Sequence, residues 1–311
     1  MYAGDGNGIA REVIRAYAGD VSGIARLFYE KSSGPAYELS YSGAYTRREV
    51  TYGGTVWDEW TCTGSGTLTK SGSDIPGCDV VVISGGGAGQ NATDLGNFGT
   101  GGGYGGVGGK LTRNNNYTID GSIAVTVGNG ASTNAGSSGA SSFGDVNAAA
   151  VSSPAGTATS PITNGGTGGG ARNGATASPG DGIGKRPFND SAAWPNVLCP
   201  GGGASAHYGM PASGPNPSRN VGGGAGGTNG GSGAIGPASS TSGGLGGATG
   251  GGRGGDASTS GDNSTNGTTY GAGGGAKGIY VNLQTSVTNR PAGVRSGYQG
   301  VVILRVPLRA A

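Results

Sequence analysis

The sequence predicts an all-β protein, with a small N-terminal β-meander followed by a glycine-rich domain of packed polyglycine-II helices framed by short β-strands. Glycine supplies 75 of the 311 residues and hydrophobic residues only 33%, so a conventional apolar core cannot extend through the whole chain. Apolar runs at residues 78–83, 123–127 and 300–306 are typical of buried strands. They are too few and too far apart for a sandwich made of strands alone.

A repeat marks residues 1–30 as a separate module. Gly8-Ile9-Ala10-Arg11 recurs as Gly23-Ile24-Ala25-Arg26, and the pairs Asn7-Gly8 and Ser22-Gly23 hold equivalent places in the two copies. Such pairs favour two-residue hairpin turns, so we predict a meander of three short strands. A helix over residues 9–17 is the alternative. Residues 31–56 then form a connector with strand-like pieces, and residues 57–311 form the glycine-rich domain.

The glycine runs are open to two interpretations, a flexible linker or a lattice of polyglycine-II helices, which have three residues per turn and no internal hydrogen bonds. Glutamate is absent after residue 59, whereas disordered chains are usually rich in charge, so we favour the lattice. Ordering glycine costs roughly 0.5–1 kcal/mol more than ordering alanine, and a hydrogen bond returns about 1 kcal/mol. Only a dense lattice pinned by apolar strands balances this cost. No Gly-X-Y triplet is sustained, which excludes collagen.

The longest and least repetitive loops, at residues 183–200, 204–220 and 282–296, are expected at the ends of this scaffold. Loops on rigid scaffolds often carry binding residues, and exposed aromatic side chains suit recognition. The alternative is that the Phe188 and Trp194 side chains fill a gap in packing. The candidate binding residues are Phe188, Trp194, His207, Tyr208, Met210 and Arg219.

No catalytic residue, metal site or cofactor is predicted. His207 is the only histidine, and no acidic residue lies near it in the sequence. The three cysteines, Cys62, Cys78 and Cys199, fit no metal-binding spacing; we expect buried thiols, although Cys62 and Cys78 could pair. The net charge of +2 gives no electrostatic reason for binding nucleic acid. The sequence shows neither a signal peptide nor an apolar run long enough to span a membrane.

Residues 57–306 resemble the glycine-rich domain of bacteriophage tail fibres and adhesins. The resemblance rests on apolar landmarks as well as on glycines: Thr67-Leu68-Thr69, the stretch from Ile75 to Gly87, Val125-Thr126-Val127-Gly128-Asn129-Gly130, Ser141-Ser142-Phe143-Gly144, and Gly297-Tyr298-Gln299-Gly300-Val301-Val302-Ile303. The N-terminal repeat is similar to short modules at the start of such virion proteins. After residue 130 the glycine runs are more interrupted than in the most regular members.

The resemblance implies a virion appendage, made in the host cytoplasm, that is homo-oligomeric (a trimer is favoured) and that meets a host receptor or glycan through distal loops. Residues 1–30 would then bind other virion proteins. The expected attachment residues are Ile9, Arg11, Val13, Ile24, Arg26 and Phe28. Alternatives are a head or neck decoration protein, a surface-polysaccharide depolymerase and, more remotely, an ice-binding protein.

Overall fold

The computed structural model contains strands and irregular segments, and no helix in the parts of the chain that it describes. The described residues are 15–19, 25–30, 37–89, 93–94, 100–101, 105–133, 136–152, 170–172, 175–178, 187–188, 190–194, 198–202, 207–210, 219–221, 250–255, 263–282, 287–289 and 295–310. The all-β prediction is confirmed for these residues.

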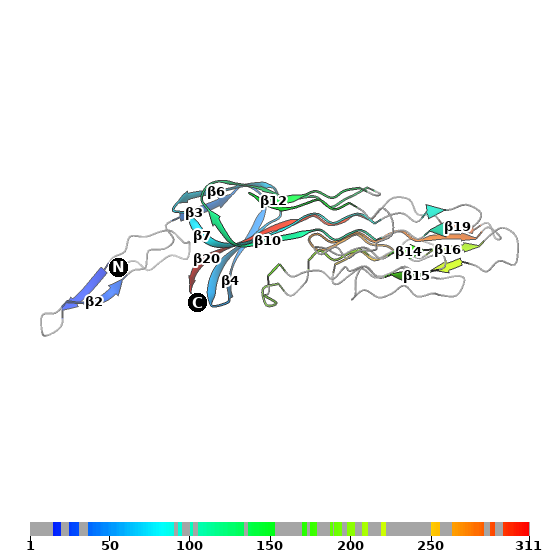
Figure 1. Cartoon of the computed structure of the whole chain (residues 1–311). Helices are drawn as coiled ribbons and strands as arrows, with labels where there is room; N and C mark the ends of the chain where they lie inside the picture. The colour runs from blue at the N-terminus through cyan, green and yellow to red at the C-terminus, as the bar shows by residue number, and fades with distance from the viewer. Residues whose placement is uncertain are drawn as a thin grey trace.

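Two five-stranded antiparallel sheets form a sandwich at one end of the glycine segments (Figure 1). The first sheet has the order β10-β7-β20-β5-β4, with β4 Tyr45–Tyr52, β5 Thr55–Cys62, β7 Ile75–Ile83, β10 Leu111–Ile119 and β20 Val301–Ala310. The second has the order β13-β12-β11-β6-β3, with β3 Tyr37–Tyr41, β6 Gly66–Gly72, β11 Ile123–Thr126, β12 Ser141–Phe143 and β13 Val146–Ala148.

A hydrophobic core fills the space between the two sheets. Trp60 and Leu304 from the first sheet meet Leu68, Val125 and Phe143 from the second, all nearly or fully buried. Successive residues on a strand point to opposite faces, so every second residue of β5, β7 and β20 enters this core. The three apolar runs predicted from the sequence are strands, and the short strands β12 and β13 complete the sandwich around them.

Strands β3 and β4 change the expected domain boundary. Both lie within residues 31–56, yet β3 pairs along its length with β6, and β4 pairs with β5 from Tyr45↔Cys62 to Tyr52↔Thr55. Residues 37–56 therefore belong to the sandwich and do not form a connector. Their polar composition, typical of edge strands with one exposed face, is what made them resemble a linker.

The outer face of the first sheet is covered as well. Val81 and Ile83 of β7 and Val301 and Ile303 of β20 pack there against Phe188, Leu198 and Cys199 in a second cluster of buried side chains. This second cover explains the unbroken apolar runs at residues 80–83 and 301–304, because a strand buried on both faces has no exposed side on which to place polar residues.

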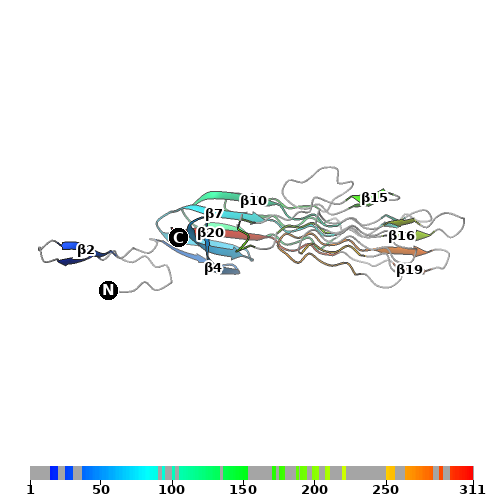
Figure 2. The same ribbon diagram turned by 90° about the horizontal axis from the view of Figure 1, so that it is seen from below.

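Beyond the sandwich, the glycine segments run side by side and bond to one another through their backbones (Figures 1 and 2). In one of them, the N–H groups of Gly273, Gly274 and Gly275 donate to Pro200 O, Gly87 O and Thr265 O, three carbonyls in three different segments. In all, residues 271–276 exchange hydrogen bonds with six segments, at residues 84–89, 105–109, 198–202, 250–255, 263–268 and 295–300.

These lateral bonds repeat every third residue. Gly86 and Gly89 donate to the carbonyls of Tyr298 and Arg295, so donors and acceptors both advance by three residues in an antiparallel pair. The same spacing recurs where Gly106 and Gly109 donate to Gly274 and Gly271, and, in parallel, where Gly252 and Gly255 donate to Gly273 and Ala276. A flexible linker does not fit this regular bonding.

Glycine is required where two segments approach most closely. A Cβ atom at Gly273 would lie on the carbonyl of Gly106, and one at Gly297 would lie on the carbonyl of Gly86. The Cα–H groups at these positions therefore face carbonyl oxygens, an arrangement that adds weak C–H···O contacts to the N–H···O bonds. Alanine is accepted where space remains, as at the fully buried Ala272 and Ala276.

A small four-stranded sheet lies at the opposite end of the glycine segments from the sandwich (Figure 1). Its order is β17-β16-β18-β19, from β17 Arg219–Val221, β16 His207–Met210, β18 Ile279–Asn282 and β19 Val287–Asn289. Two further pairs join β14 Gly170–Arg172 to β15 Ala175–Ser178, and β8 Thr93–Asp94 to β9 Thr100–Gly101. The predicted loops thus contribute strands.

At the N-terminal end, β1 Arg15–Gly19 pairs antiparallel with β2 Ala25–Glu30. Ser22 and Gly23, where a turn is predicted, lie outside the described residues. The alternative of a helix reaching residue 17 is wrong because residues 15–17 are in β1. The third strand of the predicted meander, before Asn7-Gly8, lies outside the described residues. Figure 1 places the hairpin at the end of the molecule away from the small sheet.

Candidate functional site

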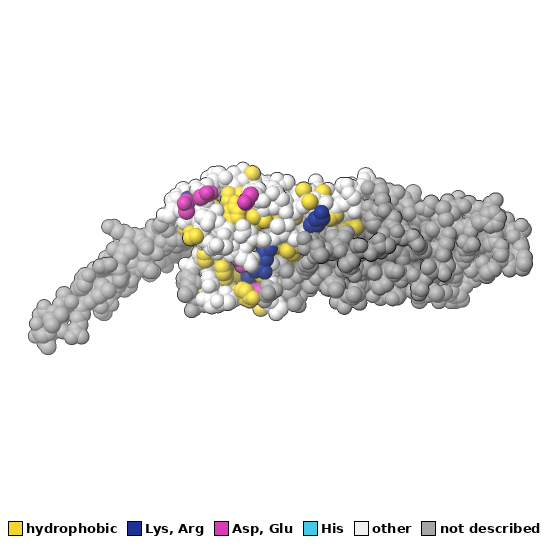
Figure 3. Space-filling view, viewed as in Figure 1, with side chains coloured by type: hydrophobic (Ala, Val, Ile, Leu, Met, Phe, Trp, Pro, Cys, Tyr) yellow, Lys and Arg dark blue, Asp and Glu magenta, His cyan; other side chains and the backbone are white. Residues whose placement is uncertain are grey.

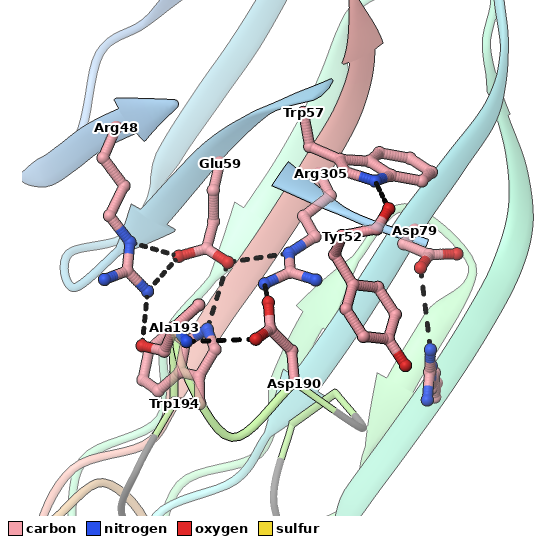
Figure 4. Close-up of polar contacts among 10 residues, drawn as sticks. Arg48, Tyr52, Trp57, Glu59, Asp79, Asp190, Ala193, Trp194 and Arg305 are labelled. Atoms are coloured by element: carbon pink, nitrogen blue, oxygen red, sulfur yellow. Dashed lines mark hydrogen bonds and ion pairs between the residues drawn. The ribbon is translucent and has the colours of Figure 1, made fainter. Parts of the chain in front are cut away.

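A row of alternating charges crosses the outer face of the first sheet. Strand register sets Arg48 of β4 opposite Glu59 of β5, Glu59 opposite Arg305 of β20, and Arg305 opposite Asp79 of β7. Asp79 also lies 3.6 Å from the Arg113 guanidinium of β10. Charges opposite one another on neighbouring strands stabilise the pairing when their signs differ. Figure 4 shows this row with the segment that covers it.

Arg305 is the centre of the row and is fully buried. Its Nε donates to Glu59 Oε2 at 2.7 Å, and its Nη2 donates to Asp190 Oδ2 at 2.9 Å. The guanidinium carbon lies 3.9 Å from the centroid of the Phe188 ring. A buried guanidinium is costly unless carboxylates neutralise it and accept its hydrogen bonds, so these contacts tie residues 188–190 to strands β5 and β20.

Competing effects set the pKa of the Asp190 carboxyl. Burial acts to raise the pKa of its carboxyl, but hydrogen bonds from the Ala193 backbone N–H and from the Arg305 guanidinium outweigh burial and lower that pKa. For Asp79 the balance is reversed: burial raises its pKa in spite of the nearby Arg113 and Arg305 charges. Asp190 is therefore the carboxylate that is specifically stabilised in its ionised form.

Glu59 positions two further side chains at the surface end of the row. The Arg48 Nε donates to Glu59 Oε1 at 2.7 Å, and the Trp194 indole Nε1 donates to Glu59 Oε2 at 3.0 Å. Arg48 Nη2 also donates to the Ala193 carbonyl at 2.9 Å, and its guanidinium lies 5.3 Å from the Trp194 ring. One buried carboxylate thus fixes both an arginine and an aromatic ring.

Arg48 and Trp194 form one wall of a cleft of about 490 Å³ between the first sheet and the glycine segments. Tyr270 and Tyr298 come from the glycine segments, with ring centroids 5.9 Å apart and ring planes tilted by 58°. Aromatic rings and small polar groups together line the cleft, a combination typical of small-molecule sites. The lining residues are Thr46, Arg48, Thr61, Ala193, Trp194, Leu198, Thr268, Thr269, Tyr270 and Tyr298.

The six candidate binding residues do not form one site. Phe188 is 1% exposed, so its ring cannot face a receptor in this fold, and the alternative of a packing role holds for it. Trp194 packs partly against the same cluster and also lines the cleft. The other four lie on two paired strands: β16 carries His207, Tyr208 and Met210, and β17 carries Arg219. The strands are antiparallel, with Gly209 opposite Arg219 and Tyr208 opposite Asn220.

The predicted attachment residues lie mostly outside the described part of the chain. Arg26 and Phe28 are on β2, where they pair with Ala18 and with the region of Ala16 and Tyr17. Ile9, Arg11, Val13 and Ile24 lie outside the described residues. The structure therefore gives the backbone of one hairpin in this module and leaves the attachment role a prediction.

The sequence contains a signal for the charge row. Arg305 interrupts the apolar run at residues 300–306, and Glu59 stands between the large apolar Trp57 and Trp60 in a strand pattern. A charged residue inside a buried run requires a partner. The partner's identity depends on strand register and on the distant Asp190 segment, which a single sequence does not specify. Tyr270 and Tyr298 lay in glycine-rich context and gave no such signal.

The three cysteines are buried and form no disulfide. Cys62 and Cys78 are on β5 and β7, which flank β20 and are therefore not adjacent strands. Burial raises the pKa of each of these two thiols to about 12. The prediction of buried thiols is confirmed, and the alternative that Cys62 and Cys78 pair is wrong.

Charged side chains are scattered as small groups on the face shown in Figure 3, with no broad region of a single sign among the coloured residues. Within the described ranges, no three histidine, cysteine or acidic side chains gather as metal ligands, and no helix there is able to cross a membrane. Comparison with protein-family models, curated proteins and solved structures found no match.

Proposed function

We propose that the chain is a structural protein of a bacteriophage virion, a tail fibre or tail-tip protein that binds the host receptor and has no catalytic role. The observation that carries this proposal is the lateral bonding of the glycine segments between the sandwich and the small sheet. Bonding of this kind holds irregular segments rigidly side by side, which is what a projecting appendage needs. The resemblance over residues 57–306 points to the same class of protein.

We further propose that these segments are polyglycine-II helices. A polyglycine-II helix has three residues per turn and directs its N–H and C=O groups outward. The three-residue repeat of the lateral bonds supports this assignment, as does the divergence of the bonds from Gly273, Gly274 and Gly275 into three neighbours. Six neighbouring segments around residues 271–276 fit the hexagonal packing expected of such helices.

The arrangement suggests a polarity for the appendage. The N-terminal hairpin would attach to the particle together with other copies of the chain, a trimer being favoured. The small sheet at the opposite end, with His207, Tyr208, Met210 and Arg219 on β16 and β17, would face the host. Phe188 is left out of this assignment because it is buried.

Deleting residues 1–30 tests attachment, because the sandwich begins at Tyr37 and should fold without them. We expect the shortened chain to show the same circular dichroism and thermal unfolding as the full chain but to be missing from purified particles. Normal incorporation would overturn the attachment role.

Adsorption measurements test receptor binding. The soluble full chain should reduce phage adsorption to host cells, and replacing His207, Tyr208, Met210 and Arg219 together by serine should remove that effect while the unfolding midpoint stays unchanged. If the full chain neither binds host cells nor reduces adsorption, a head or neck decoration role replaces the receptor-binding role.

A further inference from the structure

We propose that the cleft between the first sheet and the glycine segments binds an uncharged saccharide. This site is separate from the small sheet to which we assign receptor contact, and the inference does not depend on the virion role. Its basis is the lining of the cleft: three aromatic rings, four threonines and one arginine whose charge is already matched.

The aromatic rings supply the apolar part of a sugar site. A pyranose ring presents C–H groups on one face and hydroxyls around its rim, so it packs on an aromatic face while the rim remains free to form hydrogen bonds. Trp194 comes from the segment that covers the first sheet, and Tyr270 and Tyr298 come from the glycine segments; all three rings line the cleft. Tyr298 is 39% exposed although it is a large aromatic residue, which leaves its ring accessible from the cleft.

The threonines supply the polar part. Thr46 and Thr61 come from β4 and β5, where strand register places them opposite each other. Thr268 comes from the glycine segments, where its hydroxyl donates to Gly250 O at 3.3 Å and can still accept a hydrogen bond. The hydroxyl oxygen of Thr269 is buried, so it is not counted among these groups. A hydroxyl group both donates and accepts hydrogen bonds, as sugar hydroxyls do. Neutral hydroxyls from the sheet and from the glycine segments suit a ligand that is rich in hydroxyls and carries no charge.

The charges of the cleft argue against an ionic ligand. Among the described residues of the lining, Arg48 alone is charged, and its Nη2 lies 2.6 Å from the fully buried Glu59 carboxylate. An anionic ligand would have to compete with Glu59 for Arg48 and would also be repelled by the negative charge of Glu59. A neutral ligand avoids both costs and can still accept a hydrogen bond from the guanidinium.

The site is held in place before any ligand arrives. Glu59 fixes both Arg48 and Trp194 through hydrogen bonds, and Arg305 in turn holds Glu59. A binding site whose side chains are already ordered loses little conformational entropy when it binds. The volume of about 490 Å³ lies within the range of roughly 300–1,000 Å³ that is typical of small-ligand sites.

A second hollow of the described surface provides a contrast. It lies at the edge of β10 and β13, has a volume of about 620 Å³, and is lined by Thr112, Arg113, Asn114, Asn115, Asn116, Asp145, Val146 and Asn147. None of these described lining residues is aromatic, so they offer a sugar no ring face on which to pack. Size alone therefore does not select the cleft; its rings and hydroxyls do.

The test is a titration of the full chain, followed by tryptophan fluorescence and calorimetry. The probes are neutral di- to tetrasaccharides of glucose, galactose, mannose and N-acetylglucosamine, with uronic-acid oligosaccharides, nucleoside monophosphates and aromatic dipeptides as the other arms. We expect saturable binding of at least one neutral oligosaccharide and weaker or no binding in the other arms. No binding of any neutral oligosaccharide, or preferential binding of an anion or a dipeptide, would overturn the proposal.

Variants locate the binding. Tyr298→Ala should weaken binding by about tenfold, equivalent to about 1.4 kcal/mol, whereas Tyr298→Phe should keep most of it because the ring remains. The lattice bonds of Tyr298 come from its backbone N–H and carbonyl, so both variants should fold. The matched control is Tyr45→Ala: Tyr45 is 42% exposed and lies on β4, on the face opposite Thr46 and Arg48. Equal losses in Tyr298→Ala and Tyr45→Ala would exclude this cleft as the site.

Discussion

Asp190 is the carboxylate through which the covering segment binds the buried Arg305. Replacing it with asparagine keeps the shape of the side chain but removes the charge that faces the guanidinium at 2.9 Å. We expect Asp190→Asn to lower the free energy of unfolding at pH 7 by about 1–3 kcal/mol, measured by urea denaturation. The matched control is Asp74→Asn, because the Asp74 side chain is 64% exposed in its ion pair with Lys70 and exposed pairs contribute at most about 1 kcal/mol.

The loss of stability caused by Asp190→Asn should depend on pH. The pKa of Asp190 is lower in the folded chain than in the unfolded chain, where an aspartate titrates near pH 3.9. Its ionised form therefore stabilises the fold above about pH 4, and this contribution is lost as the pH falls through the lower, folded pKa. The difference in stability between the wild type and Asp190→Asn should narrow on acidification below about pH 4. A difference that stays constant from pH 6 to the acid limit would contradict the assignment.

At the scale of single residues, the sequence predicts whether a side chain is buried more easily than it predicts which residue that side chain contacts. The thiols of Cys62 and Cys78 were expected to be buried because small apolar side chains in strand patterns usually are, and they are buried. The place of Phe188 in an irregular loop predicts a binding role, but its ring packs against Arg305. A loop residue looks exposed in a sequence, and only the contact with a strand more than 100 residues away shows otherwise.

At the scale of elements, strands defined by their own side chains were predictable and strands defined by pairing were not. β7, β11 and β20 coincide with the three apolar runs. β4 and β16 are polar or glycine-containing, and their extended conformation depends on bonding to β5 and to β18. The β-propensity of the residues is a weak guide where neighbouring strands decide the conformation. For this reason the sequence alone predicts a connector where the structure has β3 and β4.

The glycine segments allow a direct test of their packing. Gly274 lies at the centre of the lattice, and a Cβ atom there would overlap the carbonyl of Arg295 and approach Ser296 O within 2.7 Å. We therefore expect Gly274→Ala to push two segments apart and to cost about 1–3 kcal/mol, as overpacking does. Thermal and urea unfolding of the purified chain measure this loss.

Gly121 provides the control for the same substitution. Nothing lies within 4 Å of a Cβ atom added there, and Gly121 does not have the positive φ that would strain an alanine. Gly121→Ala should leave stability unchanged or raise it by about 0.4–1 kcal/mol, because alanine restricts the unfolded chain. Similar losses for Gly121→Ala and Gly274→Ala would mean that the lattice carbonyls are not what makes glycine necessary.

At the scale of the whole molecule, the described parts form a series from the N-terminal hairpin through the sandwich and the glycine segments to the small sheet (Figures 1 and 2). The sandwich has a conventional apolar core, whereas the glycine segments are joined mainly by backbone bonds. The chain passes directly from the lattice into strand β20, since residues 295–300 bond within the lattice and residues 301–310 lie in the first sheet. The sandwich thus anchors the lattice.

Hydrogen exchange shows whether the lattice is rigid as a whole. The amides of Gly86, Gly106, Gly273 and Gly274 each donate to a carbonyl in another segment, so none can exchange unless neighbouring segments separate. We expect these amides to exchange as slowly as those of the buried strands β7 and β20, although they belong to no strand, because local opening requires a cooperative unit to come apart.

The turn at Gly53 and Gly54 should exchange quickly, since both residues are exposed and a Cβ atom added at either would meet no atom within 4 Å. This turn provides the reference rate within the same molecule. If the four lattice amides exchange as fast as this turn, the segments separate freely in solution. The stiffness on which an appendage role depends would then be absent, and the sandwich alone would account for the stability of the chain.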